Sequence, residues 1–95
     1  MEIERILTML KSDLGELFPD EDRVAYLTQI INAAMAMIQR EGITLENSAE
    51  DEQLVEMYAA YLVRKRASNE GMPRMLRWAL NNRLFSQKAM VDNGT

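Results

Sequence analysis

The side chains in this sequence that are best suited to catalytic chemistry are closely spaced carboxylates. Glu50 and Asp51 are adjacent, while Glu52 and Glu56 are four residues apart, a spacing that places both on one face of a helix. Such pairs perform general acid–base chemistry when their surroundings separate the two pKa values. These carboxylates occur at the start and on the outer face of an expected helix, so we expect them to be solvated.

Other catalytic and metal-binding patterns are missing. The 95 residues include no cysteine and no histidine, which excludes a cysteine nucleophile, the commonest general base and nearly every zinc site. Asp20 and Asp22 begin in the manner of a calcium-binding loop, but the required glycine is absent and the twelfth position is Ile31. The glycines are isolated and form no phosphate-binding loop. We therefore expect no enzymatic activity, no metal site and no cofactor.

The spacing of apolar residues predicts an all-α fold, a compact bundle of about four helices. Glycine and proline separate segments with helical periodicity, at residues 2–14, 20–41, 49–69 and 73–89. The second segment has the widest apolar arc, so we expect it to be the central helix. Residues 1–85 form the expected domain. The remaining residues, 86–95, lack strong structural signals and are expected to form a flexible C-terminal arm that is ordered only in an assembly.

Two of these helix starts carry capping residues. Asp20 is a suitable N-cap for the second helix, because its carboxylate can accept a hydrogen bond from a free backbone N–H. Ser48 and Asp51 have the spacing of a capping box, in which both side chains accept hydrogen bonds from free N–H groups of the first turn.

Charge is divided unevenly along the chain. Residues 1–63 hold four basic and thirteen acidic side chains, and residues 64–95 hold seven basic and two acidic, which gives the net charge of −4. Such a chain can attract copies of itself or bind two unlike partners. The basic part begins with Arg64, Lys65 and Arg66, which either complement the negative end of the third helix or contact nucleic acid or another acidic partner.

The last predicted helix carries two apolar stripes on opposite faces. One consists of Leu76, Leu80 and Leu84, and the other contains Trp78 and Phe85. Three arginines occupy the sectors between them: Arg74, Arg77 and Arg83. Because a terminal helix of a monomer normally buries one side only, Arg74, Arg77, Trp78, Arg83 and Phe85 form a candidate surface for another chain.

A second interpretation of this segment stays open. Asn81 and Asn82 could end the helix, in which case Phe85 folds back onto the domain and Trp78 is merely half exposed. Arg74 and Trp78 are also four residues apart, so they could simply stack on each other without any ligand.

The order, spacing and lengths of these segments resemble the small head–tail connector proteins of long-tailed bacteriophages, also called head-completion or adaptor proteins. The resemblance covers about residues 3–85. The matching features are Met9-Leu10-Lys11-Ser12-Asp13-Leu14-Gly15, Asp20-Glu21-Asp22, Leu27-x-x-Ile30-Ile31-x-Ala33-Ala34-x-x-x-Ile38 leading to Gly42, Asp51-x-x-Leu54, Ala59-Ala60-Tyr61-Leu62 and the Pro-led segment 72–85.

This resemblance implies a structural virion protein. Its relatives assemble into a ring, typically dodecameric, beneath the portal, where the ring joins the DNA-filled head to the tail and extends the DNA channel. The implied partners are copies of the chain itself, the portal protein, and a downstream stopper or tail-completion protein. Genomic DNA passes through the channel without sequence-specific binding. In such a protein Trp78 and Phe85 are expected to anchor a subunit or portal contact.

Two other functions are alternatives. A small helical DNA-binding phage regulator or packaging component would use the basic residues, although the net acidity of the chain opposes tight binding to phosphates. A plain helical interaction domain would bind some other partner. No apolar run approaches the length of a membrane span, and the first residues do not resemble a signal peptide. The expected location is the virion, with the host cytoplasm during assembly, and no membrane partner.

Overall fold

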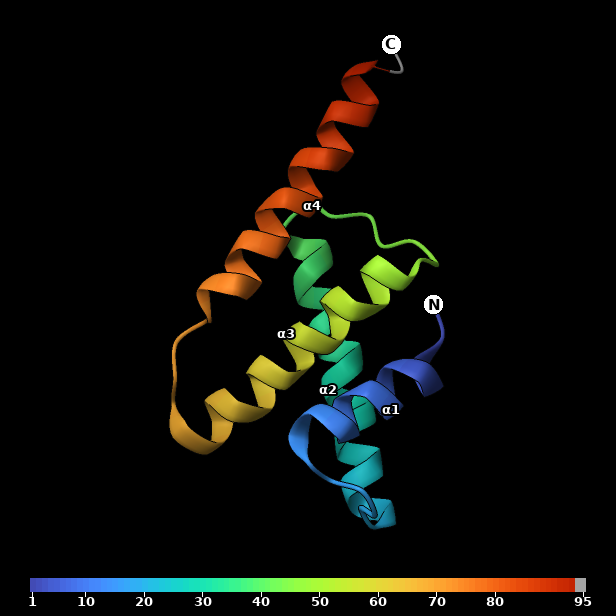
Figure 1. Cartoon of the computed structure of the whole chain (residues 1–95), viewed down its shortest axis with the longest axis vertical. Coiled ribbons are helices and arrows are strands. Elements are labelled where there is room, and N and C mark those ends of the chain that lie inside the picture. Colours follow the sequence, from blue (N-terminus) through green and yellow to red (C-terminus); the bar gives the residue numbers. More distant parts are fainter. Residues whose placement is uncertain (94–95) are drawn as a thin grey trace.

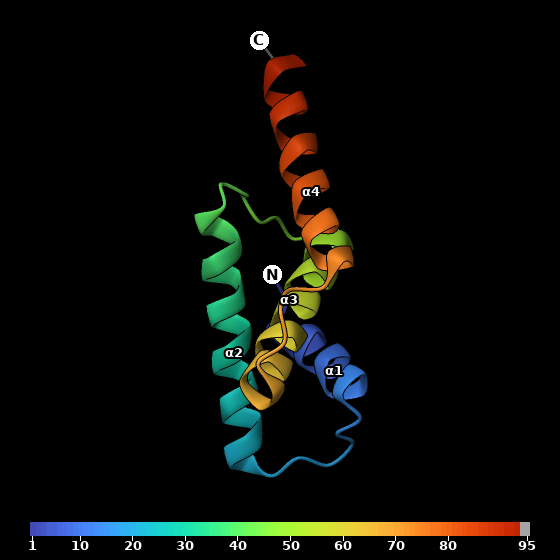
Figure 2. The same ribbon diagram turned by 90° about the vertical axis from the view of Figure 1, so that its left-hand side faces the viewer.

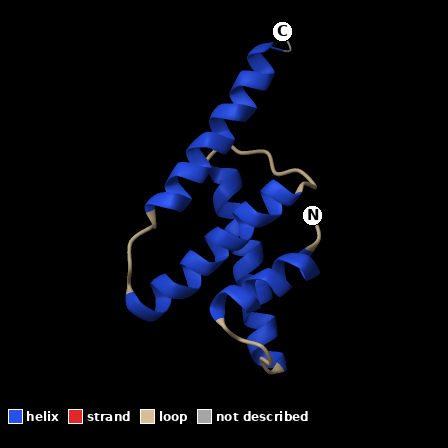
Figure 3. Cartoon of the chain, in the orientation of Figure 1, coloured by secondary structure: helices blue, strands red, loops and turns tan. Residues whose placement is uncertain are grey.

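The chain folds into four α-helices within the residues that the structure describes, 1–93, with side chains described through residue 90. The structure is a computed structural model, and it confirms the all-α prediction (Figures 1 and 3). The helices are α1 (Ile3–Leu14), α2 (Glu21–Arg40), α3 (Ala49–Ser68) and α4 (Arg74–Asn93). The first three have nearly the expected bounds, whereas α4 continues four residues past the expected end at residue 89.

Local capping explains where α2 and α3 begin. Asp20 Oδ1 accepts the backbone N–H of Arg23 at 2.8 Å, as predicted. Ser48 Oγ accepts the N–H of Asp51 at 3.1 Å, which is one half of the expected capping box. The other half is absent, because the Asp51 carboxylate accepts the N–H of Glu46 at 2.8 Å and also holds an arginine described below.

Left-handed residues end two of the helices. Gly15, with φ of +72°, follows α1, and its N–H donates to the last turn of that helix. Asn69, with φ of +56°, follows α3. Glycine adopts this conformation without a steric penalty and asparagine tolerates it, so both residues are suited to terminating a helix and turning the chain.

The central helix is α3 rather than α2, so the sequence-based expectation is wrong on this point. α3 packs against each of the other three helices, and α2 packs against α1 and α3 (Figure 2). The reason is that one edge of the wide apolar arc of α2, at Ala33 and Met37, remains exposed. On α3, Ala59 and Ala60 are buried, and their small side chains allow neighbouring helices to approach closely.

One buried cluster forms the core and draws on all four helices and the α2–α3 loop. Its largest buried apolar side chains are Ile6, Leu10, Leu27, Ile31, Ile38, Val55, Leu76 and Leu80. Leu76 and Leu80 are the contribution of α4, which lies against α3 through one face only.

The second half of α4 projects beyond the α1–α3 body in both views (Figures 1 and 2). The radius of gyration is 14.0 Å, against about 12 Å for a fully compact chain of this length. Residues 86–93 of the expected arm are thus a helical continuation of α4, and residues 94–95 lie outside the described residues. Gln87 joins the first turn of this continuation to the α2–α3 loop. Its side chain donates to the Gly42 carbonyl at 2.9 Å and accepts the Thr44 N–H at 2.7 Å.

Across residues 1–93, every helix falls short of the combined length and apolarity required to cross a bilayer.

Candidate functional site

The two opposed faces predicted for the last helix are present in α4. Leu76 and Leu80 are buried against α3, whereas the exposed fractions of Trp78 and Phe85 are 64% and 75%. Met75 is also exposed, and because it lies three residues before Trp78 the two side chains are neighbours on the helix surface. Asn81 and Asn82 lie inside the helix, so the alternative in which they end it is wrong.

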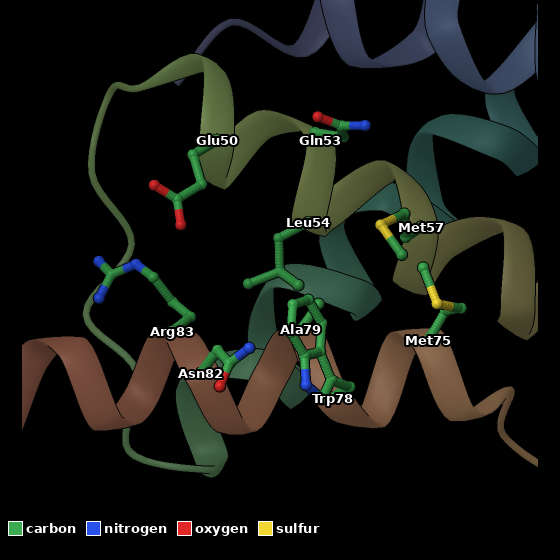
Figure 4. A pocket seen from close by; sticks show the side chains of 9 residues that line it. All are labelled: Glu50, Gln53, Leu54, Met57, Met75, Trp78, Ala79, Asn82 and Arg83. Carbon is green, nitrogen blue, oxygen red and sulfur yellow. The ribbon is translucent and has the colours of Figure 1, made fainter.

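A groove of about 350 Å³ runs between α3 and α4 beside Trp78. Its lining residues are Glu50, Gln53, Leu54, Met57, Met75, Trp78, Ala79, Asn82 and Arg83. Figure 4 shows Met57 and Met75 pointing toward one another at one end, while Glu50 and Arg83 lie at the other. The groove therefore has an apolar end with adaptable methionine side chains and a charged end. We call it the α3–α4 groove.

A shallower hollow lies on the other side of Trp78. Arg74, Met75, Arg77, Trp78 and Asn81 line it, with a volume of about 520 Å³. Because Trp78 and Met75 border both hollows, the indole forms a ridge that a partner could contact from either side. Such an exposed aromatic flanked by arginine is typical of the residues that contribute most to protein interfaces.

Arg77 contributes less free charge to this surface than the sequence suggested. Its Nη1 lies 2.8 Å from Glu41 Oε1 and its Nη2 lies 3.1 Å from Glu41 Oε2. This two-point contact raises the pKa of Arg77 and fixes the start of α4 to the end of α2. Arg74 forms no ion pair within the described residues, so it is the freer cation at this end of α4.

Arg83 is an internal anchor rather than a surface residue. Its side chain is only 12% exposed and donates to the Asp51 carboxylate at 2.7 Å and 3.1 Å and to the Thr44 carbonyl at 2.7 Å. Helical spacing placed Arg83 between the two stripes of α4, so an exposed interface position was expected for it. The tertiary fold instead directs its guanidinium into the start of α3.

The basic triplet at the end of α3 is engaged by side chains of its own chain. Arg64 Nη2 lies 3.1 Å from Asp13 Oδ1. The other two cations lie over tyrosine rings: Lys65 Nζ at 5.8 Å from the Tyr61 centroid and Arg66 Cζ at 5.7 Å from the Tyr26 centroid. These contacts, together with the position near the helix end, account for the triplet without a ligand. The cation–π contacts among residues 1–90 do not include the Arg74–Trp78 stack considered from the sequence.

The expectation that the carboxylates of α3 are solvated is wrong for Asp51 and Glu52, which are buried, and for Glu56, which is partly buried. Asp51 and Glu52 are only 1% and 5% exposed. Glu52 accepts hydrogen bonds from the Arg5 side chain at 3.0 Å and 2.9 Å and from the Glu2 backbone N–H at 3.0 Å. These bonds, from Arg5 above all, lower the pKa of Glu52. Both carboxylates thus hold neighbouring segments in place.

Glu56 lies in a different environment. Burial raises its pKa to about 7, and the negative charge and hydrogen bonding of Asp13 act in the same direction, while Arg64 opposes them. Its Oε2 atom is buried and has no hydrogen-bond partner among the side chains and backbone that the structure describes. A carboxyl group in this state can exchange a proton near neutral pH, but it lies against the end of α1 and not in the α3–α4 groove.

An exposed apolar pair in the α1–α2 loop was missed by the sequence analysis. The exposed fractions of Leu17 and Phe18 are 76% and 96%. The available signal was a Leu-Phe pair between Glu16 and Pro19, in a segment outside every helical stripe. We call this pair the α1–α2 loop knob.

Comparisons with known protein families, with curated proteins and with solved structures find no match for this chain. Within the part of the chain that the structure describes, no three acidic side chains are grouped so that they could hold a metal ion. Function is therefore inferred from the exposed face of α4, the two hollows beside it and the distribution of charge.

Proposed function

We propose that this chain is a structural subunit that assembles with copies of itself and with a larger ring-shaped partner, as do the phage head–tail connector proteins that it resembles. In this proposal it forms a ring beneath the portal of a virion and extends the DNA channel. The observation that carries the proposal is the exposed apolar stripe of α4, with Trp78 and Phe85 opposite the leucines that pack on α3.

A monomer gains nothing from an apolar stripe that it leaves in water. Leaving a large aromatic side chain in water forgoes roughly 1.5–3 kcal/mol relative to full burial. Trp78 and Phe85 are separated by two helical turns on one face of α4, so a single partner surface can cover both. Both side chains are mostly exposed on the face of α4 that points away from α3, so the stripe is accessible to another chain.

The charge distribution supports association through unlike surfaces. The acidic residues 1–63 and the basic residues 64–95 differ by fourteen units of formal charge, from −9 to +5. Contacts between two different patches of identical subunits are heterologous, and they generate a closed ring when the rotation per subunit closes. A ring of this kind is the assembly that the resemblance implies.

The direct test is the mass of the native assembly, measured for the protein alone and with the portal protein encoded in the same genome. The proposal predicts a complex containing the portal and many copies of this chain. A chain that remains strictly monomeric in the presence of the portal would contradict it. Portal and capsid genes beside the gene for this chain would be an independent supporting observation.

A further inference from the structure

We infer that the α1–α2 loop knob of one copy, Leu17 and Phe18, inserts into the α3–α4 groove of a second copy. This inference rests on the proposed function, since it names the contact between neighbouring subunits. The knob and the groove are separate features of the same chain, and each lacks an apolar partner within the described residues.

The knob consists of two strongly exposed apolar side chains. Phe18 is 96% exposed, and Leu17 beside it is 76% exposed. Glu16 and Arg23 form a two-point ion pair at 2.6 Å and 2.7 Å that bridges the loop to α2. Because this ion pair and the Asp20 cap at the start of α2 hold both ends of the loop, little ordering cost remains when the two side chains are buried.

The groove supplies a complementary space. Its volume of about 350 Å³ is at the lower end of the range for pockets that hold small ligands, so an aromatic side chain fits within it. Leu54 of α3 and Met57 and Met75 at its apolar end offer aliphatic and thioether contacts, and the Trp78 indole offers an aromatic one.

Charge complementarity favours a second copy as the occupant. The residues that follow the knob, Glu21 and Asp22, are exposed carboxylates in the first turn of α2. Arg74 is an exposed cation beside Met75 and Trp78. Seating Phe18 at the apolar end of the groove would bring these opposite charges near each other, whereas the reversed orientation would bring the acidic turn toward Glu50.

The positions of the two features require a contact between different copies. In both views the α1–α2 loop lies at the end of the molecule opposite to α4, so the knob does not reach the groove of its own chain (Figures 1 and 2). A contact between two unlike surfaces leaves one free knob and one free groove at the ends of any chain of subunits. Repetition therefore gives either a closed ring or an open filament.

Site-directed cross-linking tests this contact, because the chain has no native cysteine. Purified Glu21→Cys and Arg74→Cys variants, which keep both knob side chains, are mixed and treated with a short bismaleimide, with and without the portal. The inference predicts a cross-linked product joining the two different variants, formed at least tenfold faster than with a control mixture of Gln29→Cys and Arg74→Cys. Gln29 is exposed on α2, away from the groove. Equal yields in both mixtures, or no product in either, would overturn the inference.

A second variant separates this inference from the proposed function. Phe18→Ser changes an almost fully exposed side chain, so the monomer should keep its helical circular dichroism. We expect it to lose association between copies.

If Phe18→Ser assembles with the portal as the wild type does, the knob contact is refuted while the proposed function stands. If the wild type itself fails to assemble, the proposed function fails. If Phe18→Ser weakens portal binding but leaves cross-linking between copies unchanged, the knob contacts the portal, and insertion into the α3–α4 groove of a second copy is refuted.

Discussion

The guanidinium of Arg83 holds the carboxylate of Asp51 through two hydrogen bonds, with Nε 2.7 Å from Oδ1 and Nη2 3.1 Å from Oδ2. Asp51 lies in the first turn of α3, and Arg83 lies near the middle of α4. Arg83 also donates to the Thr44 carbonyl, so one side chain joins α4, the start of α3 and the loop before it. This contact sets the position of α4 and therefore the direction in which Trp78 faces.

Replacement of Arg83 tests that anchoring role. Arg83→Met keeps an apolar stem but leaves the buried Asp51 carboxylate without its cation, so we expect a loss of about 3 kcal/mol in the free energy of unfolding. The measurement is urea unfolding followed by circular dichroism. Arg74→Met is the matched control, and since Arg74 is exposed we expect a change within about 0.5 kcal/mol. Equal effects of the two substitutions would show that Arg83 does not anchor α4.

Glu56 makes stability depend on pH in a direction opposite to that of an ordinary ion-paired carboxylate. Its pKa in the folded chain is raised from 4.5 to about 7. Between these two values the folded state binds more protons than the unfolded state, so stability falls as the pH rises. Below the lower value both states are protonated, and the group has no differential effect.

Glu56→Gln tests this account, because glutamine resembles the protonated acid. The variant should match the wild type near pH 4 and exceed it at pH 8 by about 1 kcal/mol, less than the full pKa shift implies because the carboxyl is partly open to water. Asp13→Asn should reduce the same pH dependence by removing the neighbouring negative charge. Thermal unfolding at several pH values measures both effects. Parallel curves for wild type and Glu56→Gln from pH 4 to pH 8 would refute the assignment.

DNA binding separates the structural proposal from the alternative of a small regulator. The net charge of −4 and the internal contacts of Arg64, Lys65 and Arg66 predict no shift of duplex DNA by the isolated protein at about 0.15 M salt. An electrophoretic shift assay over a range of salt concentrations measures this. A salt-dependent shift that disappears when the three residues are changed to serine would favour the DNA-binding alternative.

The helices and their caps could be predicted from the sequence because they depend on neighbouring residues. Asp20 and Ser48 cap helices through hydrogen bonds that span only three residues, and the opposed stripes of α4 follow from helical periodicity. The exposure of Trp78 and Phe85 was one of two interpretations that the sequence left open, and it is the one found in the fold.

The contacts of the charged residues could not be predicted in the same way. Asp51 and Arg83 are 32 residues apart, and their pairing depends on the crossing of α3 and α4. Glu56 acquires its raised pKa first from burial in the folded chain and then from Asp13, which a separate helix brings beside it. Both pairings need the tertiary fold, since helical periodicity alone indicates only the face on which a side chain lies. For the same reason, the wide apolar arc of α2 wrongly indicated that α2, and not α3, is the central helix.

The central claim is that the exposed stripe of α4 holds the subunit in an assembly. Its most direct test is native mass measurement of wild type and the double variant Trp78→Ala/Phe85→Ala, each mixed with the portal protein. Met37→Ala, which shortens an exposed apolar side chain on α2, is the control. We predict that the double variant keeps the helical circular dichroism of the monomer and binds at least about 100-fold more weakly, because two aromatic anchors are lost. Met37→Ala should assemble normally. Wild-type assembly by the double variant would contradict the claim.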